Sequence, residues 1–149
     1  MNPAHSISAL LLGMVLLLPG TLSAENSKDF GQYVVHYNAL ATDMLPAEVA
    51  RKYAIRRSQN SGMINVTVLK KVLGSPGQPV HAHAEVSAQN LAGQSRSIEM
   101  REIREGNAIY YIGVFRVAHE ETLKFDLKVR PQGTPDTFPV QFSQDFYTH

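Results

Sequence analysis

Most of the chain after residue 25 alternates between apolar and polar positions with a period of two. Thr122–Arg130 shows the pattern most clearly, because Leu123, Phe125, Leu127 and Val129 alternate with charged residues. Successive side chains of a β-strand point to opposite faces, so this period predicts half-buried strands. The same pattern occurs in four other segments: Phe30–Ala39, Met63–Val72, Val80–Ala88 and Val140–Tyr147.

The period changes between Thr42 and Tyr53, where the apolar residues Leu45, Val49 and Tyr53 are spaced by four. Pro46 suits the first turn of a helix, and Arg51 and Lys52 would lie in its last turn, close to the negative end of the helix dipole. We therefore expect one short helix directly after the first strand.

Residues 98–115 predict a hairpin in the middle of the chain, with Gly106 and Asn107 forming a two-residue turn. This turn places Ile103 opposite Tyr110 and gives an expected core-facing set of Ile103, Tyr110, Ile112 and Val114. Ile98 and Met100 are out of phase with that set, so we expect a β-bulge near Arg101 and Glu102. Tyr110 and Tyr111 point to opposite faces, so one of them should lie outside the core.

Together these segments predict about seven strands and one helix, joined by turns rich in glycine, proline and asparagine. This spacing is typical of an antiparallel, immunoglobulin-like β-sandwich. A small closed barrel is the competing architecture.

The first 24 residues contain no Asp, Glu, Lys or Arg. The apolar run Ile7–Leu18 is followed by Pro19 and Gly20, and small residues end the segment at Ala24. This is the pattern of a secretory signal peptide, and the run is short for an uncleaved spanning helix of about 20 residues. We expect residues 25–149 to form a single domain located in the periplasm, with no transmembrane segment after cleavage.

Charge and cysteine content remove several classes of function. The chain has 14 basic and 13 acidic residues, a net charge of +1, which argues against nucleic acid as the main partner. It has no Cys, which excludes thiol redox chemistry and zinc–thiolate sites. We expect no cofactor and a fold stabilised by its core alone.

His81 and His83 form the strongest candidate for metal chemistry. Residues i and i+2 of a strand point the same way, so both imidazoles could reach one copper or zinc ion. A third ligand would come from His36, Glu85, His119 or His149. The alternative is that both histidines are ordinary solvent-facing residues of a strand.

Catalytic motifs are absent, and the alternating charges of residues 99–105 fit ion pairs on a solvated face, so we expect no enzyme activity. For binding to an unknown protein or envelope component, the basic residues Arg51, Arg56 and Arg57 are candidates. An exposed Tyr111 would be a suitable contact anchor.

Several segments resemble one family throughout the domain: FGQYVVHYNAL (30–40), LPAEVARKYAIRRSQN (45–60), NVTVLKK (65–71), REIREGNAIYYIGVF (101–115), TLKFDLKVRPQG (122–133) and the final FYTH. They are similar to the proteobacterial domain of unknown function 4426. The resemblance implies a small exported protein without an assigned activity, and it carries no site residues. The sequence thus favours a periplasmic, non-catalytic binding module, with a metal-binding protein as the alternative.

Overall fold

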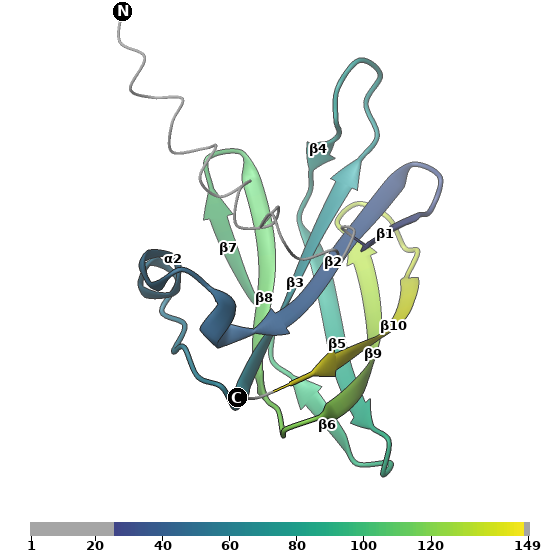
Figure 1. Ribbon diagram of the computed structural model, residues 1–149. Helices are drawn as coiled ribbons and strands as arrows, with labels where there is room; N and C mark the ends of the chain where they lie inside the picture. The colour runs from purple at the N-terminus through teal and green to yellow at the C-terminus, as the bar shows by residue number, and fades with distance from the viewer. Residues whose placement is uncertain (1–25, 148–149) are drawn as a thin grey trace, which may run out of the picture.

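A computed structural model describes residues 26–147, which form two packed antiparallel sheets (Figure 1). The first sheet contains, in spatial order, β1 (Asn26–Asp29), β2 (Tyr33–Ala41), β3 (Ser61–Lys70), β8 (Ala108–Arg116) and β7 (Arg101–Glu105), with β4 (Gln78–Pro79) paired to the end of β3. The second contains β10 (Phe138–Phe146), β9 (Glu121–Pro131), β5 (Ala82–Asn90) and β6 (Ser95–Ile98). The predicted β-sandwich is confirmed.

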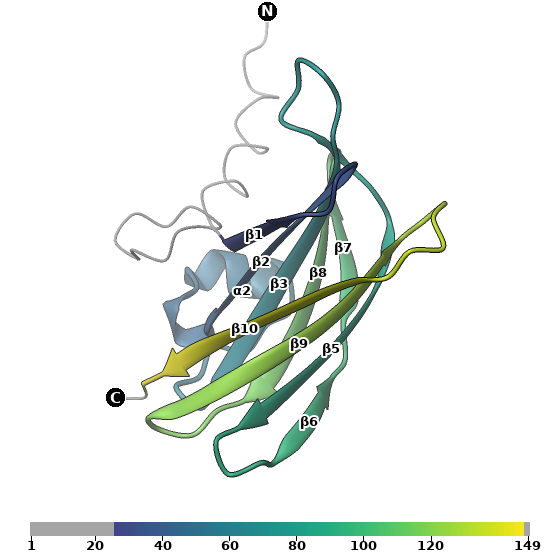
Figure 2. The ribbon, with the colours of Figure 1, turned by 90° about the vertical axis from the view of Figure 1, so that its right-hand side faces the viewer.

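The order of the strands is that of an immunoglobulin-like sandwich. Apart from the short β1 and β4, the first sheet runs β2-β3-β8-β7 and the second runs β10-β9-β5-β6. The chain completes a pair of strands in one sheet and then crosses to the other. The first sheet thereby has the ABED order of that fold, and β10-β9-β5 has the GFC order, with β6 as an additional edge strand. Figure 2 shows the two layers side by side.

The main core lies between the sheets and is centred on Phe125, of which 1% is exposed. Its ring stacks on Phe142 at 4.8 Å and meets the edges of Phe115 and Phe146 at 5.3 and 6.4 Å. The other residues of β9 expected to face inward, Leu123, Leu127 and Val129, are fully buried. The alternation of this strand was therefore sufficient to identify its core face.

The residues predicted to form the first strand of the hairpin belong to two separate strands. No bulge is therefore needed to bring Ile98 into the core. Ile98 ends β6 and pairs with Val86 in the second sheet, whereas β7 begins at Arg101 in the first. The crossing between them packs on Gly113, where a Cβ atom would lie 2.5 Å from Ile98 Cγ2 and 2.6 Å from Met100 Sδ. The alternation of apolar residues therefore changes phase here because the chain passes from the second sheet to the first.

The expected core-facing set of the hairpin was also wrong, since its members face away from the second sheet. Ile103, Tyr110 and Ile112 belong to a second, smaller core on the outer face of the first sheet, and Val114 is 45% exposed. The residues of β8 that enter the main core are Ile109, Tyr111 and Phe115. Consequently both Tyr110 and Tyr111 are buried.

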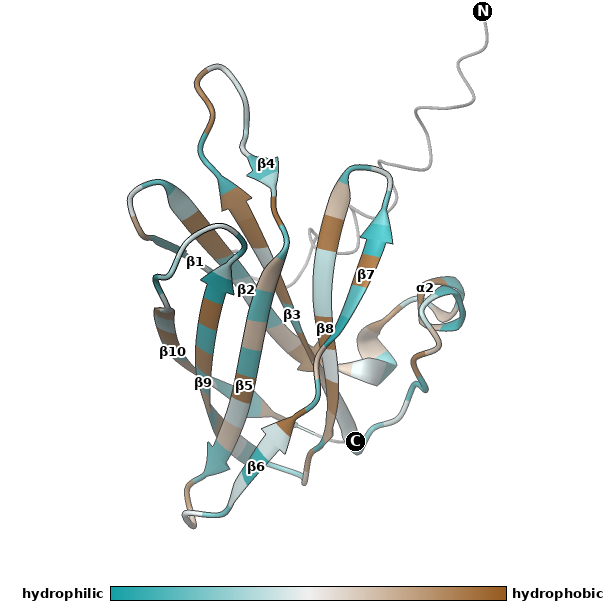
Figure 3. Cartoon of the chain, turned by 180° about the vertical axis from the view of Figure 1, so that it is seen from behind, coloured by the Kyte–Doolittle hydropathy of each residue, from teal (hydrophilic) through white to brown (hydrophobic). Residues whose placement is uncertain are grey.

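The predicted helix is present and covers this second core. It consists of a 3-10 turn, η2 (Thr42–Met44), and α2 (Ala47–Lys52) (Figure 3). Glu105 of β7 fixes its end by accepting hydrogen bonds from Lys52 and, at 2.6 Å, from the Tyr53 hydroxyl. Within residues 26–147 there is no helix with the length and apolar character needed to cross a membrane.

Candidate functional site

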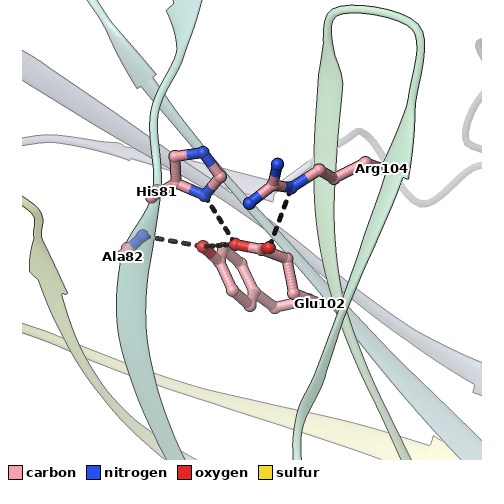
Figure 4. A network of polar contacts seen from close by, with 5 residues as sticks. His81, Ala82, Glu102 and Arg104 are labelled. Atoms are coloured by element: carbon pink, nitrogen blue, oxygen red, sulfur yellow. Dashed lines mark hydrogen bonds and ion pairs between the residues drawn. The ribbon is translucent and has the colours of Figure 1, made fainter.

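A carboxylate at the edge of the first sheet joins the two layers of the sandwich (Figure 4). Glu102 Oε1 lies 2.7 Å from His81 Nδ1 and accepts a hydrogen bond of 2.8 Å from the Tyr111 hydroxyl. Glu102 Oε2 accepts a bond of 3.1 Å from Arg104 Nε. One side chain of β7 thereby holds the residue that precedes β5.

The register of the hairpin explains why these groups meet. Glu102 pairs with Tyr111 across β7 and β8, so both side chains lie on the same side of the first sheet. The Tyr111 ring is buried, while its hydroxyl accepts a hydrogen bond of 2.7 Å from the Ala82 amide at the start of β5. A buried tyrosine thus positions both the carboxylate and the backbone beside His81.

The network keeps its carboxylate ionised. The hydrogen bond from His81, followed by that from Tyr111, lowers the pKa of Glu102 from 4.5 to about 2. Burial raises the pKa of Tyr111 to about 12, and the hydrogen bond to Glu102 further opposes ionisation of the hydroxyl. Both pKa values move away from neutrality, so neither group is tuned for general acid–base catalysis near pH 7.

The lowered pKa of Glu102 leads us to a prediction about the stability of the protein in acid. A carboxylate whose pKa is depressed by folding stabilises the native state above its ordinary pKa of 4.5, and this contribution is lost as the pH falls towards about 2. Between pH 6 and pH 3 the free energy of unfolding should therefore fall more in the wild type than in Glu102→Gln, as measured by urea denaturation. Equal losses in the two proteins would contradict this role of Glu102.

His81 and His83 border one open hollow of about 330 Å³ at the start of β5. The hollow is also lined by residues 130–134, at the end of β9 and after it, where β9 pairs with β5 and Arg130 lies opposite His83. Among the described residues no group forms a hydrogen bond with His81 Nε2, whereas His83 Nε2 lies 3.2 Å from Glu85 Oε1. Both histidines that the sequence proposed as metal ligands therefore border the same hollow.

None of the other described candidate ligands lines the hollow. Glu85 contacts His83 but borders a neighbouring hollow further along β5. His36 is on β2, paired with Thr67 of β3, and His119 is in the turn before β9; neither lines the hollow. His149 is outside the described residues. Residues 26–147 contain no group of three or more His, Asp or Glu side chains arranged to hold a metal ion.

Three of the four expected partner-binding residues are exposed, and the fourth is buried. Arg51 and Arg56 are exposed at the end of α2 and after it, and Arg57 donates a hydrogen bond of 2.8 Å to the Asp43 carbonyl. Tyr111 is only 6% exposed, so it cannot be the surface anchor that we expected. Its side chain supports Glu102 instead.

Glu102 is the residue that reasoning from sequence overlooked. A signal for its contact with Tyr111 was available, because the Gly106–Asn107 turn fixes the register that pairs the two residues. The contact with His81 had no such signal, since it joins opposite sheets.

Comparison with known proteins places the chain in a sequence family. The family described as "Domain of unknown function (DUF4426)" matches residues 27–149. A crystal structure of a DUF4426 family protein from Pseudomonas aeruginosa PAO1 is 32% identical, with a TM-score of 0.72, and the match covers 86% of this chain and 98% of that one. None of the curated proteins matches.

More distant structures share the fold alone. FetP of uropathogenic Escherichia coli strain F11, isolated after expression in a periplasm, has a TM-score of 0.57 and 10% identity, with 85% of this chain and 95% of that chain covered. A copper-bound variant of FetP has a TM-score of 0.59 and 9% identity, with 85% and 92% covered.

Proposed function

This chain belongs to the DUF4426 family, whose description assigns no function, and from its geometry we propose that it is a non-catalytic binding module of the periplasm that binds a copper(II) ion. One observation carries the proposal. Glu102 holds Nδ1 of His81, which leaves Nε2 for a ligand at the hollow that His83 also borders.

The contact between Glu102 and His81 resembles the one that orients metal-binding histidines in other proteins. Such imidazoles donate the N–H of one ring nitrogen to a carboxylate and bind the metal through the other nitrogen. A neutral His81 that donates from Nδ1 to Glu102 has its lone pair on Nε2. Because Tyr111 and Arg104 also bond to Glu102, the carboxylate stays in place and ionised.

Copper(II) suits this set of donors better than zinc. Structural zinc sites use four protein ligands, whereas copper(II) accepts tetragonal geometry and binds most tightly among the common divalent ions. His81 and His83 supply two imidazole nitrogens at the hollow, and solvent completes the coordination. A protein of the same fold is described as copper-bound, which makes copper the first ion to test.

Two further features support export and a non-catalytic role. The uncharged, apolar pattern of residues 1–24 favours a signal peptide, and these residues lie outside the described part of the chain. The carboxyl groups with shifted pKa values, including Glu102 and Glu105, are all held more acidic by ion pairs and hydrogen bonds. Groups of that kind stabilise structure and do not exchange protons near pH 7.

Replacing Glu102 with glutamine tests the proposed orientation of His81. Loss of a carboxylate that orients a metal-binding histidine weakens metal binding about 10- to 100-fold, and we expect that decrease for copper(II) in isothermal titration calorimetry. Glu99→Gln is the matched control, because Glu99 is exposed and lies in the adjacent crossing between sheets. Equal affinities in the two variants, or no copper binding by the wild type, would contradict the proposal.

A further inference from the structure

The loop between β3 and β4 carries an apolar tip beyond the end of the sandwich (Figures 1 and 2). Leu73 at this tip is 101% exposed and its neighbour Val72 is 45% exposed. Lys70 and Lys71 precede them and are exposed as well. Figure 3 shows this hydrophobic segment at the outer end of an otherwise polar loop.

The loop holds Leu73 outward by regular turn geometry. The Ser75 amide donates a hydrogen bond of 3.2 Å to the Val72 carbonyl, and Gly74 has a φ of +75°. A positive φ at the third of the four turn residues is typical of a type II turn, in which Leu73 is the second residue. The Gly77 amide bonds to Ser75 Oγ at 3.0 Å, and the Lys71 amide bonds to the Gln32 carbonyl at 2.8 Å. These hydrogen bonds thus hold the loop in a conformation that leaves its apolar tip in solvent.

From this arrangement we infer that the β3–β4 tip, defined as Lys70–Leu73, docks the protein on an anionic phospholipid surface. Aliphatic side chains enter the boundary between headgroups and acyl chains, while adjacent lysines remain at the level of the phosphates. Lys71 also pairs with Asp29 at 2.6 Å, but both side chains are at least half exposed, so this ion pair is weak and leaves the lysine available.

The residue types favour a membrane over a protein partner. Interfaces between proteins rely on Trp, Tyr and Arg in desolvated pockets, and lysine and leucine are under-represented at their energetic centres. An aliphatic pair beside two lysines instead matches the two attractions of a lipid surface, which are apolar burial and negative surface potential. Single exposed apolar residues are common, and it is their combination with the two lysines that points to a lipid surface.

The chain provides a matched control. Leu91 in the turn between β5 and β6 is 74% exposed and lies at the opposite end of the sandwich, and residues 88–94 around it contain no lysine (Figure 1). The chain also contains no Trp, so one introduced tryptophan reports on its own surroundings. Residues 25–149 are the protein to test, since the DUF4426 family model matches residues 27–149.

The experiment adds vesicles to Leu73→Trp and to Leu91→Trp, each free of metal. Vesicles of phosphatidylcholine with phosphatidylglycerol should shift the emission of Leu73→Trp to shorter wavelength and leave that of Leu91→Trp unchanged. In co-sedimentation, Leu73→Ser should bind these vesicles about tenfold more weakly than the wild type, because one apolar anchor is lost. Lys70→Gln with Lys71→Gln should weaken binding and remove most of its salt dependence.

Three results would overturn the inference. The first is no binding of the wild type to anionic vesicles, and the second is equal binding by Leu73→Ser. The third is a tip that cross-links to a protein in envelope extract but ignores vesicles, which would assign it to a protein partner. All variants lie at exposed positions, and unchanged thermal unfolding would establish that each is folded.

Discussion

Replacing both His81 and His83 with alanine should reduce the affinity for copper(II) by more than about 100-fold, since losing the direct ligands costs more than losing the carboxylate that orients one of them. Each single variant should retain part of the affinity, because one imidazole remains at the hollow. Titration calorimetry at neutral pH, with the apo protein prepared by chelation, measures both effects.

His119→Ala is the control for this experiment. His119 is 58% exposed and lies in the turn before β9, away from the hollow. Its variant should bind copper(II) like the wild type, whereas loss of binding in all three histidine variants would indicate non-specific surface binding. Binding should also weaken at acid pH, because protons compete with the metal for the imidazole nitrogens.

Truncating Phe125 to alanine should have the largest effect on stability. Its ring contacts three other aromatic rings at the centre of the main core, and it is 1% exposed. Removing such a side chain costs about 3–5 kcal/mol through lost burial and the cavity left behind. That is a large part of the 5–15 kcal/mol that is usual for a domain. Urea denaturation followed by circular dichroism measures the change.

The neighbouring Lys124 offers a direct comparison. It belongs to the same strand but points to solvent, so Lys124→Ala should change the free energy of unfolding by less than about 0.5 kcal/mol. If Phe125→Ala unfolds completely, the larger substitute in Phe125→Leu should restore a measurable transition. A Phe125→Ala protein as stable as Lys124→Ala would show that the core is not organised around this ring.

Alternation predicted the strands well but could not always identify the buried face. In β9 one face is apolar and the other charged, so the inward set was correct. In β8 both faces are apolar, because one meets the second sheet and the other lies under the segment containing α2. For that reason Tyr110 and Ile112 were assigned to the main core when they belong to the second one.

Crossings between sheets were the other feature that the sequence did not reveal. Ile98 and Met100 looked like residues of a bulged strand, although they flank a passage from β6 to β7. The same passage brings Glu102 close to His81, a contact across 21 positions. Local spacing predicted the two histidines, whereas the carboxylate that orients one of them depends on how the sheets pack.

The central claim is that His81 and His83 bind one copper(II) ion at the same hollow. Electron paramagnetic resonance of the protein with one equivalent of copper(II) tests it most directly. The expected spectrum is that of a tetragonal site with coupling to two imidazole nitrogens, reduced to one nitrogen in His83→Ala. A spectrum of hydrated copper, or one that His81→Ala and His83→Ala leave unchanged, would contradict the claim.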